Sequence, residues 1–357
     1  MAANDVAISL ARLIRHGGPI SLARFMAEAN RHYYATRDPF GAKGDFVTAP
    51  EISQMFGELI GLWSVETWNA LGRPTPVNLV ELGPGRGTLM ADALRAARAA
   101  PAFASAMRLH MIETSPALIG KQREALAAFG STWHENLDAV PEGPLIVIAN
   151  EFFDALPIRQ FERAPRGWHE RLVGLDASGA FHFALAPDPV AGMAMLPGST
   201  PPGSVVEICA AAEALAEQIA RRIVAAGGAA LIVDYGTSCR QPGGTLQALR
   251  GHARHPPLEA PGSADLTAHV DFKALARAAE TAGARAWGPV AQGDFLSRLG
   301  IAERASALSR RATHREAGEI RAAVERLTGA DGMGTLFQVL ALTAPGAAPP
   351  AGFESPV

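Results

Sequence analysis

The stretch Val80-Glu81-Leu82-Gly83-Pro84-Gly85-Arg86-Gly87-Thr88-Leu89 decides the fold, because an apolar strand pattern enters it and a helical pattern leaves it. Its three alternate glycines let the backbone turn tightly and approach a ligand without a Cβ atom in the way. The spacing excludes two common nucleotide-binding turns. A dinucleotide fingerprint needs its third glycine where the chain has Thr88, and a P-loop needs a lysine that this stretch lacks.

Strand and helix patterns alternate around this turn. Apolar runs predict four buried strands, at Val77–Leu82, Arg108–Glu113, Pro144–Ala149 and Ala229–Asp234. Alternation of this kind predicts a parallel sheet with helices on both faces. The expected fold class is therefore α/β, a Rossmann-like sheet with a helical N-terminal block and an inserted region.

The remaining segments predict the division into domains. Residues 1–76 are expected as a helical cap, 77–157 and 229–343 as the Rossmann-like core, 158–228 as a β-hairpin and helical insertion, and 344–357 as a flexible tail. Short alternating segments around the turn Asp176–Gly179 indicate the hairpin. The polar stretch Tyr235–Val270 predicts a long loop.

Composition narrows the function classes. The chain has 357 residues, of which 48% are hydrophobic and 19% charged, as expected of a cored α/β enzyme. A net charge of -3 gives no general footprint for nucleic acid, and no apolar run is long enough for membrane insertion. Neither Cys209 nor Cys239 lies in a metal-spaced pair, so we expect no metal and a reducing, cytoplasmic location. The oligomeric state stays open, with a dimer among the alternatives.

The pattern E-x-G-x-G-x-G that begins at Glu81 resembles the first motif of Rossmann-like methyltransferases. In that setting Glu81 faces the cationic amino-acid end of the cofactor, and Glu113, at the end of the second strand, accepts hydrogen bonds from the ribose hydroxyls. The alternatives are structural: Glu81 caps a neighbouring helix while the glycines only make a turn, and Glu113 caps the helix that starts near Pro116.

The segment around Asn136 and Leu137 lies where the loop after a third strand would meet the adenine. The Asn136 side chain could hydrogen-bond the edge of the base. A plain turn is the alternative interpretation.

Four blocks together resemble the MidA family, a group of bacterial and mitochondrial methyltransferase-like proteins. The blocks are the glycine turn, Ala149–Pro157 (ANEFFDALP), Gly44–Gly61 (GDFVTAPEISQMFGELIG) and Asp265–Phe272 (DLTAHVDF), and they occur in the expected order. The family includes a complex I assembly factor that methylates an arginine of a core subunit. The resemblance therefore implies S-adenosyl-L-methionine as cofactor and a protein substrate, a respiratory complex I subunit. The predicted cofactor-binding residues are Glu81, Gly83, Pro84, Gly85, Gly87, Glu113, Asn136, Leu137 and Asn150.

A guanidinium acceptor needs carboxylates to orient it and to leave one nitrogen free to attack. Glu151 and Asp154 stand three residues apart just past the predicted strand Pro144–Ala149 and would share a face in a helical turn. Asp234, at the end of the predicted strand Ala229–Asp234, would stand beside them. We predict these three as catalytic residues; the alternative is that each caps a neighbouring helix.

Three further residues are predicted to contact the substrate. Asp45 and Tyr34 would close the site from the N-terminal block, and His269 is a candidate proton acceptor. Packing for the tyrosine and a bystander role for the histidine are the alternatives.

Two other functions remain open at the level of the sequence. The fold could act as a non-catalytic scaffold or chaperone for a partner protein, although an intact glycine turn with both acids disfavours an inactive pocket. A small-molecule methyltransferase is the other alternative, because the long loop would suit a lid as well as a rim for a protein substrate. Titration with the cofactor separates the scaffold from the enzymes.

Overall fold

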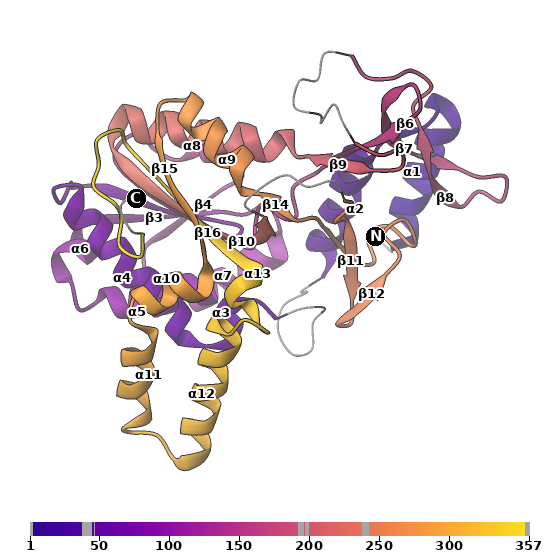
Figure 1. Cartoon of the computed structure of the whole chain (residues 1–357). Helices are drawn as coiled ribbons and strands as arrows, with labels where there is room; N and C mark the ends of the chain where they lie inside the picture. Colours follow the sequence, from indigo (N-terminus) through magenta and orange to yellow (C-terminus); the bar gives the residue numbers. More distant parts are fainter. Residues whose placement is uncertain are drawn as a thin grey trace. The chain divides into compact units, whose positions relative to one another are not determined.

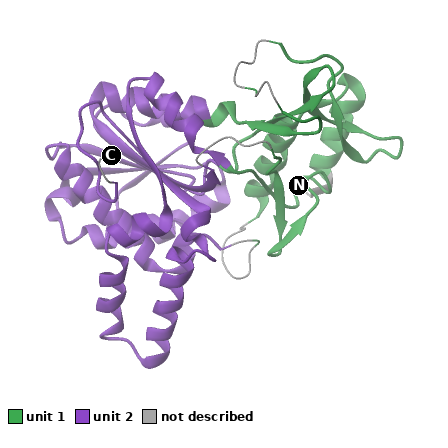
Figure 2. Cartoon of the chain, viewed as in Figure 1, with its two compact units in different colours: residues 1–46, 154–212, 239–269 green, residues 47–153, 213–238, 270–357 purple. Residues whose placement is uncertain are grey.

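A computed structural model describes residues 3–37, 45, 47–191, 196, 200–237 and 243–353. The chain divides into two compact units, each assembled from separate stretches of sequence (Figure 2). Unit 1 comprises residues 1–46, 154–212 and 239–269, and unit 2 comprises residues 47–153, 213–238 and 270–357.

Unit 2 is built on one sheet in the strand order β15-β16-β10-β5-β2-β3-β4, with the short β14 paired to β10. Five neighbouring strands are parallel: β10 (Gly228–Thr237), β5 (Leu145–Asn150), β2 (Val77–Leu82), β3 (Met107–Ile112) and β4 (Ser131–His134). Four of them correspond to the predicted strands, and β4 is an additional one. The α/β fold class is confirmed. The central strands are apolar on both faces because both faces are covered.

Helices cover both faces of this sheet (Figure 1). One face holds α4 (Gln54–Ala70), α5 (Thr88–Ala97) and α10 (Gln292–Arg298), which pack on the inward residues of β2, β5 and β10. The other face holds α8 (Ala210–Ala226) and α9 (Phe272–Thr281). The remaining short elements of this unit are α3 (Ala49–Ile52), α6 (Pro101–Ala106), α7 (Pro116–Ala125), the 3-10 turn η1 (Leu137–Ala139), α13 (Met333–Leu336) and β14 (Val270–Asp271).

The last two strands, β15 (Arg285–Ala291) and β16 (Phe337–Thr343), run antiparallel to their neighbours. The sheet is therefore mixed, which corrects the expectation of an all-parallel sheet. An apolar run carries no information on its direction, so only pairing in three dimensions decides this point.

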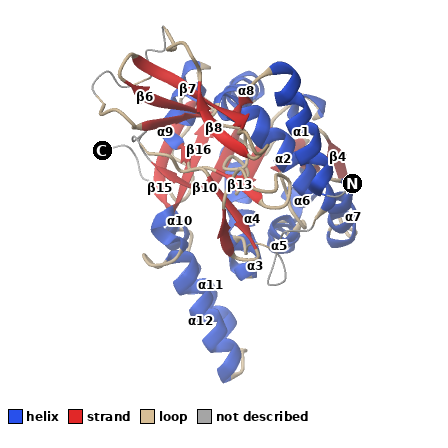
Figure 3. Ribbon diagram, turned by 90° about the vertical axis from the view of Figure 1, so that its right-hand side faces the viewer, coloured by secondary structure: helices blue, strands red, loops and turns tan. Residues whose placement is uncertain are grey.

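Between these strands, α11 (Ile301–Ser309) and α12 (His314–Thr328) form a helical hairpin (Figures 1 and 3). A capping box between Thr313 and Glu316 starts α12. At the chain's end Phe353 is buried against Phe295, with ring centroids 5.5 Å apart, so the structure orders part of the expected flexible tail. Residues 354–357 lie outside the described residues.

Unit 1 combines two helices with two small antiparallel sheets. Helices α1 (Ala3–Gly17) and α2 (Leu22–Thr36) accompany a sheet of β1 (Ile20–Ser21), β7 (Gly167–Leu175), β6 (Arg159–Ala164) and β9 (Val205–Ile208), with β8 (Phe181–Leu185) on β7. The predicted hairpin around Asp176 is formed by β7 and β8. The second sheet has the order β12-β11-β13, from β11 (Gln247–Arg250), β12 (Ala253–His255) and β13 (Asp265–Thr267).

The observed units differ from the expected domains in several places. Residues 213–228, expected as the end of the insertion, belong to unit 2, and residues 154–157, expected in the core, belong to unit 1. Residues 47–76, expected as part of an N-terminal cap, belong to unit 2, because the apolar face of α4 packs on α5 and the sheet. Residues 243–267, expected as loop, supply β11, β12 and β13 of unit 1, while residues 238–242 of that stretch lie outside the described residues. Among the described residues, no helix is long and apolar enough to cross a membrane.

Helix α4 approaches α5 through glycines. A Cβ atom on Gly61 would lie 2.3 Å from the carbonyl oxygen of Ala93, and one on Gly57 would lie 2.6 Å from the Cβ of Asp92. We therefore expect Gly61→Ala to push the helices apart and to lower the free energy of unfolding by roughly 1–3 kcal/mol in urea titrations.

The matched control is Gly120→Ala, in the middle of α7, where an added Cβ meets nothing within 4 Å. That change should raise the free energy of unfolding by about 0.5–1 kcal/mol through helix propensity alone. Equal effects of the two substitutions would contradict the close α4–α5 packing.

Candidate active site

The glycine turn leaves β2 and enters α5 with three left-handed residues. The φ angles of Gly83, Gly85 and Gly87 are 60°, 55° and 82°. A Cβ atom on Gly83 would lie 2.6 Å from the ring of Phe152, which covers the turn. Residues other than glycine would be strained here, so the sequence interpretation of the turn holds at the level of the backbone.

Glu81 lies on β2 just before the turn and is only 3% exposed. Its Oε2 atom is buried and has no hydrogen-bond partner among the described residues. Burial raises the pKa of this carboxyl to about 8. A buried acid in this condition favours a ligand that brings a cation or a hydrogen-bond donor.

Glu113 follows β3, and one of its carboxylate oxygens accepts hydrogen bonds from the next two residues of its own loop. Its Oε1 accepts hydrogen bonds from the backbone N–H groups of Thr114 and Ser115, both at 2.8 Å, while Ser115 caps α7. Burial is the largest influence on its pKa and raises it, against the lowering effect of these hydrogen bonds. The alternative, in which Glu113 caps the helix that starts near Pro116, is not realised as such: Ser115 caps that helix, and one oxygen atom of Glu113 holds the loop before it.

Gln122, on α7, joins the parts of this site and was missed by the sequence interpretation. Its fully buried Nε2 group donates to the carbonyl oxygen of Gly85 at 2.8 Å and to Oε2 of Glu113 at 3.1 Å. Its Oε1 accepts from Nε1 of Trp133 at 2.8 Å. A signal was present: Gln122 lies four residues past Leu118, on the buried face of α7.

Asn136 and Leu137 have structural roles. The Asn136 side chain accepts a hydrogen bond from the backbone N–H of Ala139 at 3.3 Å and caps η1. Leu137 is buried, and its carbonyl oxygen accepts from Arg222 at 2.8 Å. The geometry therefore supports the alternative interpretation, in which this segment is a plain turn.

Asn150 and Glu151 stand at the carboxyl end of β5. The Asn150 Oδ1 atom is buried without a hydrogen-bond partner among the described residues, and its Nδ2 donates to Oε1 of Glu151 at 3.3 Å. The same Glu151 oxygen accepts from the backbone N–H of Ala49, at the start of α3, at 3.0 Å. Glu151 has φ 50°, and strained backbone of this kind concentrates at functional sites.

The segment after β5 forms no helix, so the expected helical turn with Glu151 and Asp154 on one face is corrected. Asp234 is fully buried, and its Oδ2 accepts from the backbone N–H groups of Phe152 and Phe153 at 3.1 and 2.9 Å, while Oδ1 accepts from that of Tyr235 at 2.9 Å. Asp234 therefore positions the segment after β5, and its predicted catalytic role stays a prediction.

The other predicted residues belong to unit 1. Tyr34 lies with its hydroxyl 3.0 Å from both carboxylate oxygens of Asp265, and Asp45 accepts from the hydroxyl of Tyr33 at 2.5 Å. His269 donates its backbone N–H to Oγ1 of Thr245 at 2.8 Å, and burial lowers its pKa. Asp154 also falls in unit 1 and is buried.

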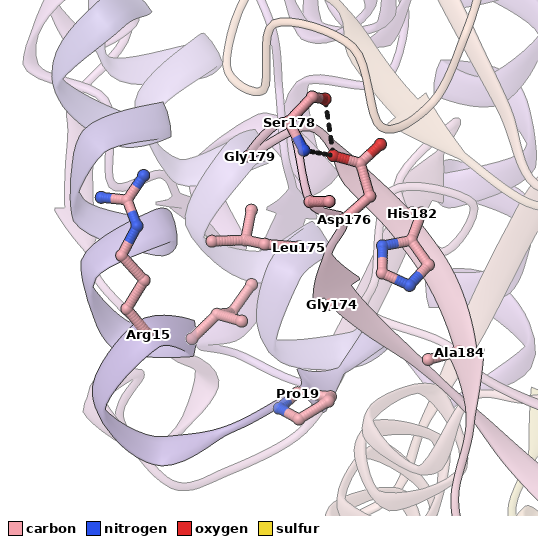
Figure 4. Close-up of a pocket in the computed structure, with 11 residues that line it drawn as sticks. Arg15, Pro19, Gly174, Leu175, Asp176, Ser178, Gly179, His182 and Ala184 are labelled. Carbon is pink, nitrogen blue, oxygen red and sulfur yellow. Dashed lines mark hydrogen bonds between the residues drawn. The ribbon is translucent and has the colours of Figure 1, made fainter.

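A separate hollow of about 700 Å³ lies in unit 1, along α1 and the β7–β8 hairpin (Figure 4). Asp176 at its rim accepts hydrogen bonds from the backbone and hydroxyl of Ser178 at 2.8 and 2.6 Å, which close the hairpin turn. None of the predicted site residues lines it. The hollow therefore gives no support to the predicted site.

The residues of unit 2 fit the chemistry of S-adenosylmethionine. The orphaned Glu81 carboxyl suits a cationic α-amino group, and the glycine cradle suits close backbone approach to a ligand without phosphate. Glu51 secures the cradle, since its Oε1 accepts from the hydroxyl of Thr88 at 2.6 Å. Fold and site together define a Rossmann-like methyltransferase.

Comparison with known proteins leads to the same class, a methyltransferase. Residues 59–290 match the model of a family of S-adenosyl-L-methionine-dependent methyltransferases. The protein arginine methyltransferase NDUFAF7 of Danio rerio is 39% identical over 328 residues (84% of this chain, 77% of the relative), and that of Homo sapiens is 37% identical over 318 residues (81% and 71%). A solved Burkholderia thailandensis structure bound to S-adenosyl-homocysteine superposes with a TM-score of 0.85 at 30% identity, covering 99% of this chain and 96% of the other.

The chain belongs to the MidA family of S-adenosylmethionine-dependent methyltransferases. The predicted family and the predicted cofactor are confirmed. The expected cytoplasmic location is contradicted, because the curated relatives named above are mitochondrial proteins. Cys239, used for that expectation, lies outside the described residues, and Cys209 is half-buried, with its thiol 3.4 Å from the carbonyl oxygen of Pro157.

The Gln122 bridge, its hydrogen bonds to Gly85 and Glu113, predicts an effect on cofactor affinity. Gln122→Met fills similar space but leaves the carbonyl oxygen of Gly85 and a carboxylate oxygen of Glu113 without their shared donor. We expect affinity for S-adenosylhomocysteine, measured by titration calorimetry, to fall at least about tenfold. The half-buried Gln218→Met on α8 should leave affinity unchanged; an unaffected Gln122→Met would remove the bridge from the site.

Glu81 predicts a pH effect. The folded pKa of about 8 lies above the ordinary value of 4.5, so between these limits the folded protein holds a proton that the unfolded chain has lost. This group's stabilising effect is complete below about pH 4.5 and is lost as the pH rises through 8. Glu81→Gln should therefore match wild type in urea at pH 5 and be more stable than wild type at pH 8.

The same variant should bind S-adenosylhomocysteine more weakly, because an amide cannot pair with the ligand's ammonium group. The surface variant Glu142→Gln is the control for both measurements. Wild-type affinity in Glu81→Gln would show that this carboxyl does not meet the ligand.

Proposed function

We propose that the chain is a protein-arginine N-methyltransferase whose acceptor is a subunit of respiratory complex I. The names of the relatives, which match 81% or more of this chain at 37–39% identity, support an arginine acceptor. The carrying observation is the position of Glu151. It precedes Phe152, whose ring lies against the glycine turn, so a carboxylate stands beside the cofactor cradle.

When bound, S-adenosylmethionine supplies an electrophilic methyl group on a sulfonium. Attack by a guanidinium nitrogen forms an N–C bond as the S–C bond breaks, and the nitrogen gives up one proton. Glu151 is the candidate to orient the guanidinium and to accept that proton. Its backbone is held by the N–H···O bond to Val233, at 2.9 Å, and its Oε1 is oriented by Ala49 and Asn150.

The proposal predicts a split between binding and catalysis. Glu151→Gln keeps an oxygen that can accept from Ala49 and should bind S-adenosylhomocysteine as wild type does. Methyl transfer should fall by roughly 10²–10⁴-fold, because the proton acceptor is gone. The assay is transfer of tritiated methyl groups to complex I isolated from a strain that lacks this protein.

Peptide mapping of the same samples identifies the acceptor. One arginine should carry the label with wild-type protein and none with Glu151→Gln, while Glu142→Gln, at an exposed position, serves as the control. Label on small molecules alone, or on no arginine, would refute the proposed acceptor. Full activity in Glu151→Gln would exclude that residue as the base.

A further inference from the structure

Strand β13 of unit 1 has two chemically opposite faces. Ala264, Leu266 and Ala268 belong to an apolar core with residues of α1 and α2. Because side chains alternate along a strand, Asp265 and Thr267 lie together on the face away from this core. In the sequence S-A-D-L-T-A at residues 263–268, polar residues alternate with apolar ones, and the strand itself spans Asp265–Thr267.

Asp265 is buried at 4% exposure, and no cationic side chain of the described residues pairs with it. The hydroxyl of Tyr34, shared between its two oxygens at 3.0 Å, is its side-chain donor, and no arginine, lysine or histidine of the described part of the chain forms an ion pair with it. Carboxylates are rarely buried in this way unless a cation pairs with them. The Asp265 carboxyl can therefore accept further hydrogen bonds from a cationic ligand.

Independent atoms beside it also lack partners. Oγ1 of Thr267 and Oγ of Ser263 are both buried, in residues 5% and 3% exposed, and neither has a hydrogen-bond partner among the described residues. A buried hydroxyl without a partner destabilises the folded protein. Ser263 and Thr267 stand two residues before and two residues after Asp265 in the sequence, and two buried hydroxyls together with one carboxyl fit a ligand that donates several hydrogen bonds at once.

Further acids add to the negative field. Burial, followed by the charge of Asp154, raises the pKa of Asp265 to about 8, and Asp45 acts in the same direction. Tyr33 and Tyr34 hold Asp45 and Asp265 in place and stack edge to face, with centroids 5.2 Å apart. A bound cation would relieve this repulsion, whereas an anion would increase it.

We propose that the Asp265–Thr267 face of β13 binds a guanidinium group, the side chain of a substrate arginine. A guanidinium presents five N–H donors in a plane, which matches two carboxylate oxygens flanked by hydroxyl acceptors; an ammonium presents three donors from one point. The inference deepens the proposed function and rests on it for the identity of the ligand as substrate.

The test is calorimetric titration of the full chain, saturated with S-adenosylhomocysteine, with N-acetyl-arginine amide, N-acetyl-lysine amide and N-acetyl-citrulline amide. Wild type should bind the arginine derivative at least about tenfold more tightly than the other two. Equal binding of citrulline would indicate a neutral polar pocket and overturn the proposal, as would preference for lysine or no binding of arginine.

Two variants localise the binding. Asp265→Asn should weaken arginine binding at least about tenfold. Thr267→Val removes a hydroxyl that has no partner, so it should unfold at the same or higher urea concentration and yet bind arginine several-fold more weakly. Retained affinity in both variants would overturn the site, and loss of affinity in Thr267→Val cannot come from unfolding if stability is kept.

Matched controls make the same chemical changes elsewhere. Asp176→Asn alters an exposed hairpin acid. Thr343→Val removes a hydroxyl that accepts from Nε1 of Trp287 at 2.9 Å, so it should lower stability. Arginine affinity should stay at the wild-type value in both.

Methyl-transfer kinetics and arginine binding, measured on the same variants, separate the two proposals. Normal methylation of arginine with an unchanged KM in Asp265→Asn would refute the β13 site and leave the proposed function standing. Arginine binding that depends on Asp265, in a protein that methylates no arginine, would refute the proposed function while the cation site remains.

Discussion

The carboxylate of Asp234 holds the segment that follows β5, and the candidate active site depends on that hold. By accepting the backbone N–H groups of Phe152 and Phe153, it fixes a stretch of chain that has no regular hydrogen bonding of its own. The ring of Phe152 then lies against Gly83, and Glu151 is kept at a left-handed φ of 50°. The buried Asp234 carboxylate thus connects β10 to the glycine turn and to Glu151, the proposed base.

Gln122 does the corresponding work on the other side of the turn. Its single amide group meets a backbone carbonyl, a carboxylate and an indole N–H, so one side chain sets three elements relative to one another. Because each of these partners would be costly to leave unsatisfied in the interior, the arrangement is rigid. Rigidity of this kind is what a site needs when its chemistry consists mainly of positioning.

Against this background of satisfied groups, the unsatisfied ones are informative. Among the described residues of unit 2, the buried oxygens without partners include Oε2 of Glu81 and Oδ1 of Asn150 at the cofactor site, and also Oε1 of Gln292 elsewhere in the unit. In unit 1 the buried hydroxyls of Thr267 and Ser263, two residues after and two residues before Asp265, lack partners among the described residues. Both sets contain an acid with a raised pKa, and both call for a donor that carries positive charge, one for the α-ammonium of a cofactor and one for a guanidinium.

The sequence alone determined the class of the protein. The glycine spacing of Gly83, Gly85 and Gly87 excludes other nucleotide sites, because turn geometry is local, and the strand runs of the parallel core follow from local periodicity. Tertiary structure decided what depends on distant partners: the direction of β16, the use of Asp234 for backbone amides, the bridge made by Gln122 and the division into two units. Apolar runs carry no direction, and a carboxylate's role depends on which donors the fold brings within about 3 Å of it.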